Sequence, residues 1–157
     1  MVIVSAHAPR LGSVPDPSAA PASSASWSAS PAPARPVRVI LVDDDPLTRA
    51  AIKPLLRPGQ DYVVVAEAGD GREAIDVVGR IEADIVLMDL GMPVMDGIEA
   101  TRQICAAPRH PHVVALTTWD VDDAVVRVIE AGAVGYLLKY SASEELHAGL
   151  RRVMAGE

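Results

Sequence analysis

The sequence has few of the residues on which several classes of protein depend. It contains one cysteine, no phenylalanine and only 3% aromatic residues in 157 positions. The single Cys105 excludes a disulfide within the chain and a cysteine-rich metal site, and it fits a reducing compartment such as the cytoplasm. Two tryptophans and three tyrosines are too few for an aromatic surface on which single-stranded nucleic acids could stack.

Positive charge and long apolar runs are also scarce. The 14 lysines and arginines are outnumbered by 21 aspartates and glutamates, which gives a formal net charge of −7. Proteins that bind duplex DNA present a basic surface to the phosphates, so this composition argues against direct DNA binding by the segment. No apolar run reaches the roughly 18 residues of a membrane-spanning helix, and the first residues lack the features of a secretory signal. We therefore expect a cytoplasmic protein without a membrane segment.

Residues 1–36 differ in composition from the rest of the chain. Alanine, proline and serine account for 24 of these 36 residues, and seven of the 13 prolines fall here. Such a segment cannot bury enough apolar surface to offset the entropy lost on ordering it. We predict a disordered tail over residues 1–36 and one folded domain over residues 37–157. A proline-rich ligand for a partner protein, or a start codon placed too far upstream, would also explain the tail.

From residue 37 onward, short apolar segments that suit strands alternate with amphipathic segments that suit helices. The predicted strands cover residues 37–42, 62–66, 84–88, 113–116 and 134–138, and the predicted helices begin near residues 46, 70, 96, 120 and 141–143. The expected helix N-caps are Asp45, Asp70, and Ser141 or Ser143. Pro54 should shorten or kink the first helix. Five strands alternating with five helices predict a doubly wound α/β domain with a parallel sheet.

Polar residues stand where the predicted strands end. Asp43, Asp44 and Asp45 follow the first strand, Asp89 the third, Thr117 the fourth and Lys139 the fifth. The carboxyl ends of parallel strands meet at one edge of the sheet, where ligands bind in such folds, so we expect a common site. Two like charges at 4 Å repel by about 4 kcal/mol near a protein surface, so clustered carboxylates need a cation. Carboxylates without a neighbouring histidine indicate Mg²⁺ rather than zinc, and the added ammonium and hydroxyl groups suit a phosphoryl group.

Four stretches of the sequence resemble the receiver domain of bacterial two-component response regulators, in the NarL/LuxR-type branch. They are LVDDDP, DIVLMDLGMPVMDG, VVALTT and GAVGYLLK, and the resemblance covers residues 37–157. It implies a flavodoxin-like fold with strand order 2-1-3-4-5 and five helices. It also implies a signalling protein rather than an enzyme, with a sensor histidine kinase as partner, Mg²⁺ as cofactor and a homodimer on phosphorylation.

The resemblance also places individual roles on this chain. Asp89 corresponds to the phosphoacceptor, and Asp43 and Asp44 correspond to the acid pair. Asp44 and Asp89 would bind Mg²⁺ through their carboxylates, and the Gly91 carbonyl corresponds to the third protein ligand. Gly91 has no side chain, so this position can neither help nor block a water molecule that attacks the phosphoryl group.

A second set of counterparts concerns the response to phosphorylation. Thr117 and Lys139 correspond to the hydroxyl and the ammonium that contact the phosphoryl oxygens. Tyr136 corresponds to the aromatic residue that turns inward when Thr117 moves. This two-state change would reshape the surface of the fourth helix, fifth strand and fifth helix. Tyr140 stands where many receivers have proline, and Pro54 is unusual in the first helix of this family.

Two other functions remain open at this point. Asp43–Asp45 has the D-x-D spacing of Mg²⁺-dependent phosphatases of the haloacid-dehalogenase type, although Leu47 departs from that motif and the later acid pair is missing. A receiver-like module that acts without phosphate is the other alternative, and the complete acid set argues against it. Members of the NarL/LuxR branch continue into a helix-turn-helix domain beyond the position of Glu157. The chain is therefore interpreted as a stand-alone receiver or as the front part of a transcription factor.

Overall fold

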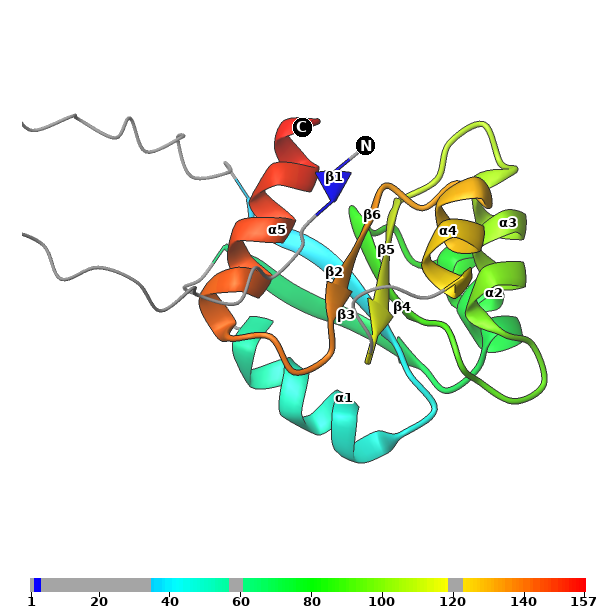
Figure 1. Ribbon diagram of the computed structural model, residues 1–157, viewed down its shortest axis with the longest axis horizontal. Coiled ribbons are helices and arrows are strands. Elements are labelled where there is room, and N and C mark those ends of the chain that lie inside the picture. Colours follow the sequence, from blue (N-terminus) through cyan, green and yellow to red (C-terminus); the bar gives the residue numbers. More distant parts are fainter. Residues whose placement is uncertain (1, 4–34, 57–60, 119–122) are drawn as a thin grey trace, which may run out of the picture.

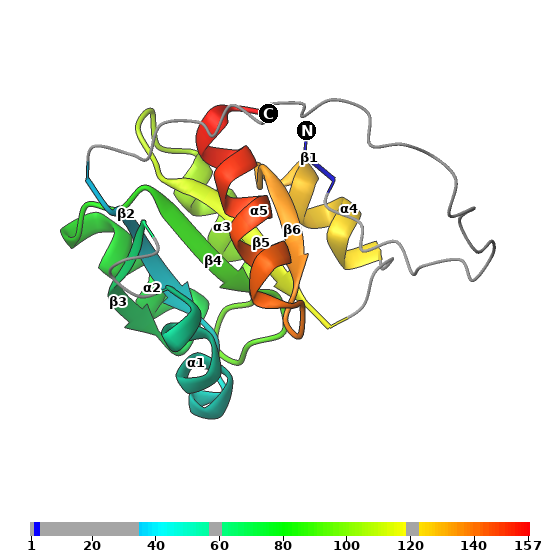
Figure 2. The same cartoon turned by 90° about the vertical axis from the view of Figure 1, so that its left-hand side faces the viewer.

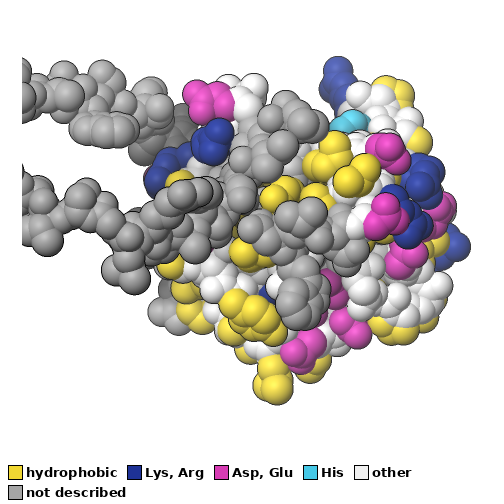
Figure 3. Space-filling view, in the orientation of Figure 1, with side chains coloured by type: hydrophobic (Ala, Val, Ile, Leu, Met, Phe, Trp, Pro, Cys, Tyr) yellow, Lys and Arg dark blue, Asp and Glu magenta, His cyan; other side chains and the backbone are white. Residues whose placement is uncertain are grey.

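The computed structural model describes residues 2–3, 35–56, 61–118 and 123–157. Most of the predicted tail lies outside the described residues, as does the predicted start of the fourth helix at Asp120. No helix in these ranges is long and apolar enough to cross a membrane. Figure 3 shows basic and acidic side chains interspersed over α2 and α3, rather than a continuous surface of one sign.

The described strands form one parallel sheet (Figure 1). They are β1 (Val2–Ile3), β2 (Val37–Val42), β3 (Tyr62–Ala68), β4 (Ile85–Asp89), β5 (His112–Thr117) and β6 (Gly135–Leu138). The strand order is β1-β6-β5-β4-β2-β3. Counted from residue 37, this is the order 2-1-3-4-5, so the predicted flavodoxin-like topology is confirmed. The two-residue β1, which pairs with β6, was not predicted.

Five α-helices connect these strands. They are α1 (Pro46–Ile52), α2 (Gly71–Arg80), α3 (Gly97–Cys105), α4 (Asp123–Glu130) and α5 (Ser143–Ala155). A short 3-10 helix, η1 (Lys53–Leu56), follows α1 directly. Pro54 lies inside η1, which agrees with the prediction that this proline shortens the first helix, because its ring has no N–H to donate.

The helices cover the two faces of the sheet in separate layers. Figures 1 and 2 show α1 and α5 on one face, and α2, α3 and α4 on the other. Alternate residues of each central strand point to opposite layers. In β4, Ile85 and Leu87 pack with the α1 and α5 layer, whereas Val86 and Met88 pack with the other. This burial of both strand faces explains why the central strands are continuous apolar runs.

Local capping follows the sequence at most helix starts. The Asp45 carboxylate accepts from the Leu47 N–H at 2.9 Å, and the Asp70 carboxylate accepts from the Glu73 N–H at 2.9 Å. The prediction for the last helix is wrong. Ala142 occupies the N-cap position of α5 and no side chain caps it, so neither Ser141 nor Ser143 has that role.

Described residues before Val37 make contacts with the folded domain. Arg35, which the composition assigns to the tail, makes a two-pronged ion pair with Asp84, at 2.9 Å from Nη1 and 2.8 Å from Nη2. Val2–Ile3 pairs with Gly135–Tyr136 at the outer edge of β6. These described residues depart from the expectation of a tail without structure over residues 1–36. A composition count misses them because both contacts are made with distant parts of the sequence.

Candidate functional site

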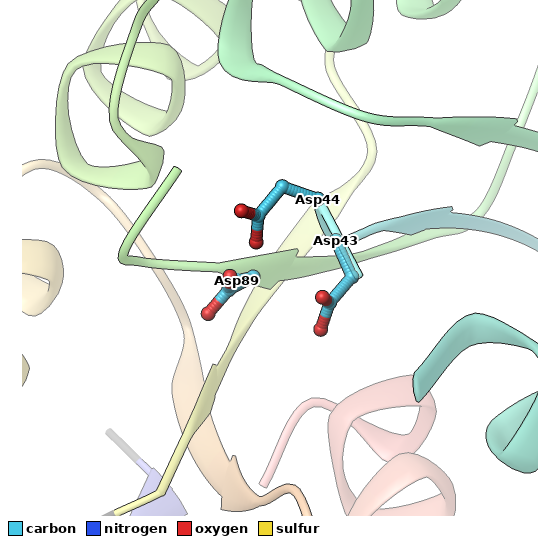
Figure 4. Close-up of side chains that lie close together, drawn as sticks. All are labelled: Asp43, Asp44 and Asp89. Atoms are coloured by element: carbon cyan, nitrogen blue, oxygen red, sulfur yellow. The ribbon is translucent and has the colours of Figure 1, made fainter. Parts of the chain in front are cut away.

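Three aspartates meet at the carboxyl edge of the sheet. Asp43 and Asp44 follow β2, and Asp89 is the last residue of β4, which lies beside β2. One carboxylate oxygen from each residue lies within 4.8 Å of those of the other two. Figure 4 shows the three side chains grouped at the strand ends, with the Asp44 carboxylate directed toward that of Asp89. Asp43 and Asp89 are buried and Asp44 is exposed.

Lys139 brings positive charge to two of these carboxylates. Its Nζ lies 2.8 Å from Asp43 Oδ2 and 3.0 Å from Asp89 Oδ1. The main chain places it there, because the Lys139 N–H donates to the Thr117 carbonyl at 2.9 Å and continues the pairing of β5 with β6. The predicted meeting of Asp43, Asp89, Thr117 and Lys139 at one edge therefore occurs.

Burial and charge shift the pKa values of the two central groups. Burial raises the pKa of Asp89 above its usual value, and the opposing hydrogen bond from Lys139 does not cancel this effect. Burial would lower the pKa of Lys139, but its hydrogen bonds with Asp43 and Asp89 outweigh burial and raise it. The raised pKa of Lys139 favours its charged form, whereas burial disfavours the charged form of Asp89.

The polar groups of Asp43 are held from several sides. Its N–H donates to the Ala68 carbonyl at 3.1 Å, and its Oδ1 accepts from the Asp45 N–H at 2.9 Å. Its carbonyl oxygen accepts a hydrogen bond from Arg49 Nη1. Arg49 was not predicted from the sequence as a residue of this site. Its position near the start of α1 is the feature that could have indicated this role, because a long side chain there can reach back to the preceding turn.

The loop between β4 and α3 is tightly closed beside Asp89. The Gly97 N–H donates to the Leu90 carbonyl at 3.1 Å, and a Cβ on Gly97 would lie 1.9 Å from the Asp89 carbonyl oxygen. Only glycine fits there. Val94 has a φ of 67°, and the Met95 N–H donates to the Pro93 carbonyl at 2.7 Å across it, which makes a γ-turn of the rare, strained form.

The remaining predicted site residues lie around this cluster. Thr117, at the end of β5, and Tyr136, in β6, are buried, with 8% and 6% of their surface exposed. Tyr136 packs with the apolar residues beneath α2, α3 and α4. Gly91 is exposed, and its N–H donates to Asp89 Oδ1 at 3.5 Å. A Cβ at Gly91 would meet nothing within 4 Å.

The donor set fits a hard divalent cation. Three carboxylates come together, and Lys139 is the one cation that pairs with them among the described residues. Asp43 Oδ2 is buried and receives no hydrogen bond of regular geometry, although it faces Lys139 Nζ. Oxygen-only ligands of this kind suit Mg²⁺ or Ca²⁺ better than zinc or copper.

Comparison with known proteins identifies the family of this chain. Residues 39–151 match the family model described as response regulator receiver domain. The chain belongs to the response regulator receiver family. The transcriptional regulatory protein LiaR of Bacillus subtilis is 42% identical over 121 residues, which are 77% of this chain and 57% of LiaR. The nitrate/nitrite response regulator NarP of Escherichia coli is 40% identical over 118 residues, or 75% of this chain and 55% of NarP.

Solved structures agree with this membership. A LuxR-family response regulator from Aurantimonas sp. SI85-9A1 superposes with a TM-score of 0.71 at 38% identity, covering 78% of this chain and 87% of that one. The receiver domain of a NarL protein from Mycobacterium tuberculosis gives 0.73 at 29% identity, covering 78% and 99%. This receiver chain spans about half the length of the curated relatives it matches.

Proposed function

We propose that Asp89 accepts a phosphoryl group from the phosphohistidine of a sensor histidine kinase. The observation that carries this proposal is the meeting of Asp89 with two further carboxylates and Lys139 at the carboxyl edge of the sheet. An Asp89 carboxylate oxygen attacks the phosphorus and forms a new P–O bond. The P–N bond of phosphohistidine breaks, and the imidazole leaves with the electron pair. Lys139 and the Thr117 hydroxyl would bind oxygens of the transferred group.

Mg²⁺ is the proposed cofactor. Asp89 and Asp44, whose carboxylate is directed toward that of Asp89 in Figure 4, would hold it together with the Gly91 carbonyl, and Asp43 completes the acid cluster. When bound, the ion supplies positive charge that offsets the carboxylates and the phosphoryl oxygens. The ion pair between Lys139 and Asp43, at 2.8 Å, keeps Lys139 beside the cluster.

The proposed output is a two-state change around Tyr136. The Tyr136 side chain is buried in β6, which pairs with the strand that ends at Thr117, and we expect the phosphorylated state to hold it inward through the Thr117 hydroxyl. Phosphorylation adds about −1.5 to −2 charges at Asp89 and so favours that state. The surface of α4, β6 and α5 would then serve a homodimer. Light scattering with and without beryllofluoride and Mg²⁺ tests the dimer, and an unchanged mass would contradict it.

The same proposal places the protein in the cytoplasm and in transcription control. The relatives named above include a transcriptional regulator, and they are longer than the matched region. DNA binding would then belong to a separate domain, since the described segment is acidic and its charges alternate in Figure 3. Sequencing the reading frame past Glu157 tests this point directly, and a helix-turn-helix there supports it.

Intact mass measurement with acetyl phosphate and Mg²⁺ tests the central proposal. Wild type should gain the mass of one phosphoryl group, and Asp89→Asn should gain none. Asp96→Asn, which alters an exposed helix cap in the same loop, should behave as wild type. An adduct that survives in Asp89→Asn but disappears in Asp43→Asn would favour the phosphatase of the haloacid-dehalogenase type. No adduct in any variant, and no effect of Mg²⁺, would favour the phosphate-independent module.

A further inference from the structure

Arg49 connects three elements that meet beside the acid cluster. Its Nη1 donates to the carbonyl oxygen of Asp43, and its Nε donates to Glu67 Oε1 at 3.2 Å. The Arg49 side chain is only 22% exposed. Through it, α1 is joined to the turn after β2 and to β3. Glu67 also pairs with Lys53 Nζ at 2.7 Å, so the carboxylate that holds Arg49 is itself anchored.

The position of the bond on Asp43 gives it a particular consequence. The Asp43 carbonyl and the Asp44 amide belong to one peptide unit, which is planar and rigid. A hydrogen bond to that carbonyl therefore fixes the direction in which the chain enters Asp44. Asp44 is the exposed acid of the cluster, and no described hydrogen bond or ion pair holds its side chain. Its carboxylate depends on the backbone for its placement.

The carboxylates themselves work against this placement. Like charges within 4.8 Å repel one another, and Lys139 pairs with Asp43 and Asp89 but not with Asp44 among the described contacts. Repulsion therefore favours rotation of Asp44 away from the cluster. A fixed peptide unit keeps the Asp44 Cα beside the cluster, so that only the side-chain torsions remain to be ordered when a cation binds, and it adds no cation that would occupy the carboxylate oxygens.

We propose that Arg49 is a positioning residue, which fixes the peptide unit between Asp43 and Asp44 so that the three carboxylates stay arranged for a divalent cation. The inference rests on the proposed function in one respect, namely that the cation is Mg²⁺. Groups that orient metal ligands without touching the metal change metal affinity by about 10- to 100-fold when removed. Arg49 acts in this way on Asp44 through the main chain.

The guanidinium is suited to this task by its shape. Its planar fork donates to the Asp43 carbonyl and the Glu67 carboxylate at the same time, from different nitrogens. A lysine at position 49 has one ammonium on a flexible stem and would reach one partner well at a time. We therefore expect Arg49→Lys to keep part of the effect and Arg49→Gln to lose it.

The test is a Mg²⁺ titration of the full chain by calorimetry, with thermal unfolding measured without Mg²⁺. Arg49→Gln should weaken Mg²⁺ binding about 10-fold, and Arg49→Lys should fall between it and wild type. The matched control is Lys53→Gln, which removes the other partner of Glu67 but leaves the Asp43 carbonyl bonded. It should lower the melting temperature by no more than Arg49→Gln, because Lys53 is 47% exposed and has one partner, while leaving the affinity for Mg²⁺ unchanged.

A second measurement separates positioning from general loss of structure. With acetyl phosphate, Arg49→Gln should need more Mg²⁺ for half-maximal phosphorylation and should reach the same extent when Mg²⁺ is saturating. Equal Mg²⁺ affinity in Arg49→Gln, Lys53→Gln and wild type overturns the inference, as does an equal loss in both variants. If Arg49→Gln does not fold, the Mg²⁺ affinity of Arg49→Lys is compared with those of Lys53→Gln and wild type instead. Wild type that binds Mg²⁺ but takes no phosphate contradicts the proposed function and leaves the role of Arg49 standing.

Discussion

Asp84 and Asp89 stand at the two ends of β4 and have opposite electrostatic surroundings. Asp84 precedes the strand at the amino edge of the sheet, where both its oxygens pair with Arg35 and one accepts the Arg38 N–H at 2.8 Å. Asp89 ends the strand at the carboxyl edge, where it shares Lys139 with Asp43. At the first edge Asp84 has its own donors, whereas at the second edge one ammonium serves two of three clustered carboxylates among the described contacts.

The pKa shifts follow this difference. Burial alone would raise the pKa of Asp84, but the hydrogen bonds from Arg35 and the Arg38 N–H lower it below its usual value. Burial raises the pKa of Asp89, and Lys139 compensates only in part. Asp84 therefore stabilises the fold above about pH 4 and loses this effect as the pH falls through its lowered pKa. The ion pair at the amino edge stabilises the fold. At the carboxyl edge, part of the negative charge has no cationic partner among the described contacts.

Among the substitutions at the two edges of the sheet, removal of Lys139 should change the stability most. Lys139→Met leaves Asp43, whose side chain is fully buried, and Asp89, with 8% exposed, without their cation. Loss of one partner of a buried ion pair costs about 3–5 kcal/mol, so urea unfolding at pH 7 should show a loss of that size. Adding Asp43→Asn to this variant should restore part of the stability. A loss below about 1 kcal/mol would mean that water already solvates these carboxylates.

Gly97→Ala tests how tightly the carboxyl edge is packed. Its Cβ would lie 1.9 Å from the Asp89 carbonyl oxygen, so the loop must shift, and overpacking of this kind costs about 1–3 kcal/mol. The control is Gly91→Ala in the same loop, where the new methyl group enters open space. Unfolding in urea should separate the two variants. Equal stabilities would show that the loop adapts without strain.

Asp84→Asn tests the amino edge. It removes the charge that pairs with Arg35 while keeping the shape of the side chain, and loss of hydrogen bonds to a charged group costs about 1–2 kcal/mol at pH 7. The difference from wild type should shrink as the pH falls below about 4, because wild-type Asp84 then becomes protonated as well. Urea unfolding of wild type and Asp84→Asn from pH 7 to pH 2 should show their free energies of unfolding becoming equal. A constant difference would contradict the lowered pKa.

Val94→Asn should have the smallest effect, and it should be stabilising. Val94 has a φ of 67°, a conformation that a β-branched residue adopts only with strain and that asparagine tolerates. The side chain is 86% exposed, so little packing is lost on substitution. We expect a gain of about 0.5–1 kcal/mol in urea unfolding. Val126→Asn, at an exposed position of α4, is the control and should not gain stability.

Local patterns predicted the strand ends and most helix starts because both depend on neighbouring residues. The Asp45 and Asp70 caps, the effect of Pro54 and the meeting of Asp89 with Lys139 all follow from order along the chain and a parallel sheet. The Arg35–Asp84 and Arg49–Asp43 contacts could not be predicted, because long cationic side chains have many possible partners in reach. The predicted cap of α5 was wrong for another reason. Two serines near the helix start gave equal local signals, and neither side chain caps the helix.

The pairing of β1 with β6 carries a consequence for the order of folding. Val2 lies opposite Gly135, so β1 has no partner until synthesis has passed residue 135. Contacts between such distant residues form slowly, although the entropy of closing a long loop grows only with the logarithm of its length. The other five strands can pair without it, because they are closer to one another along the chain. The sheet therefore gains its first strand last, and that strand covers the outer edge of β6.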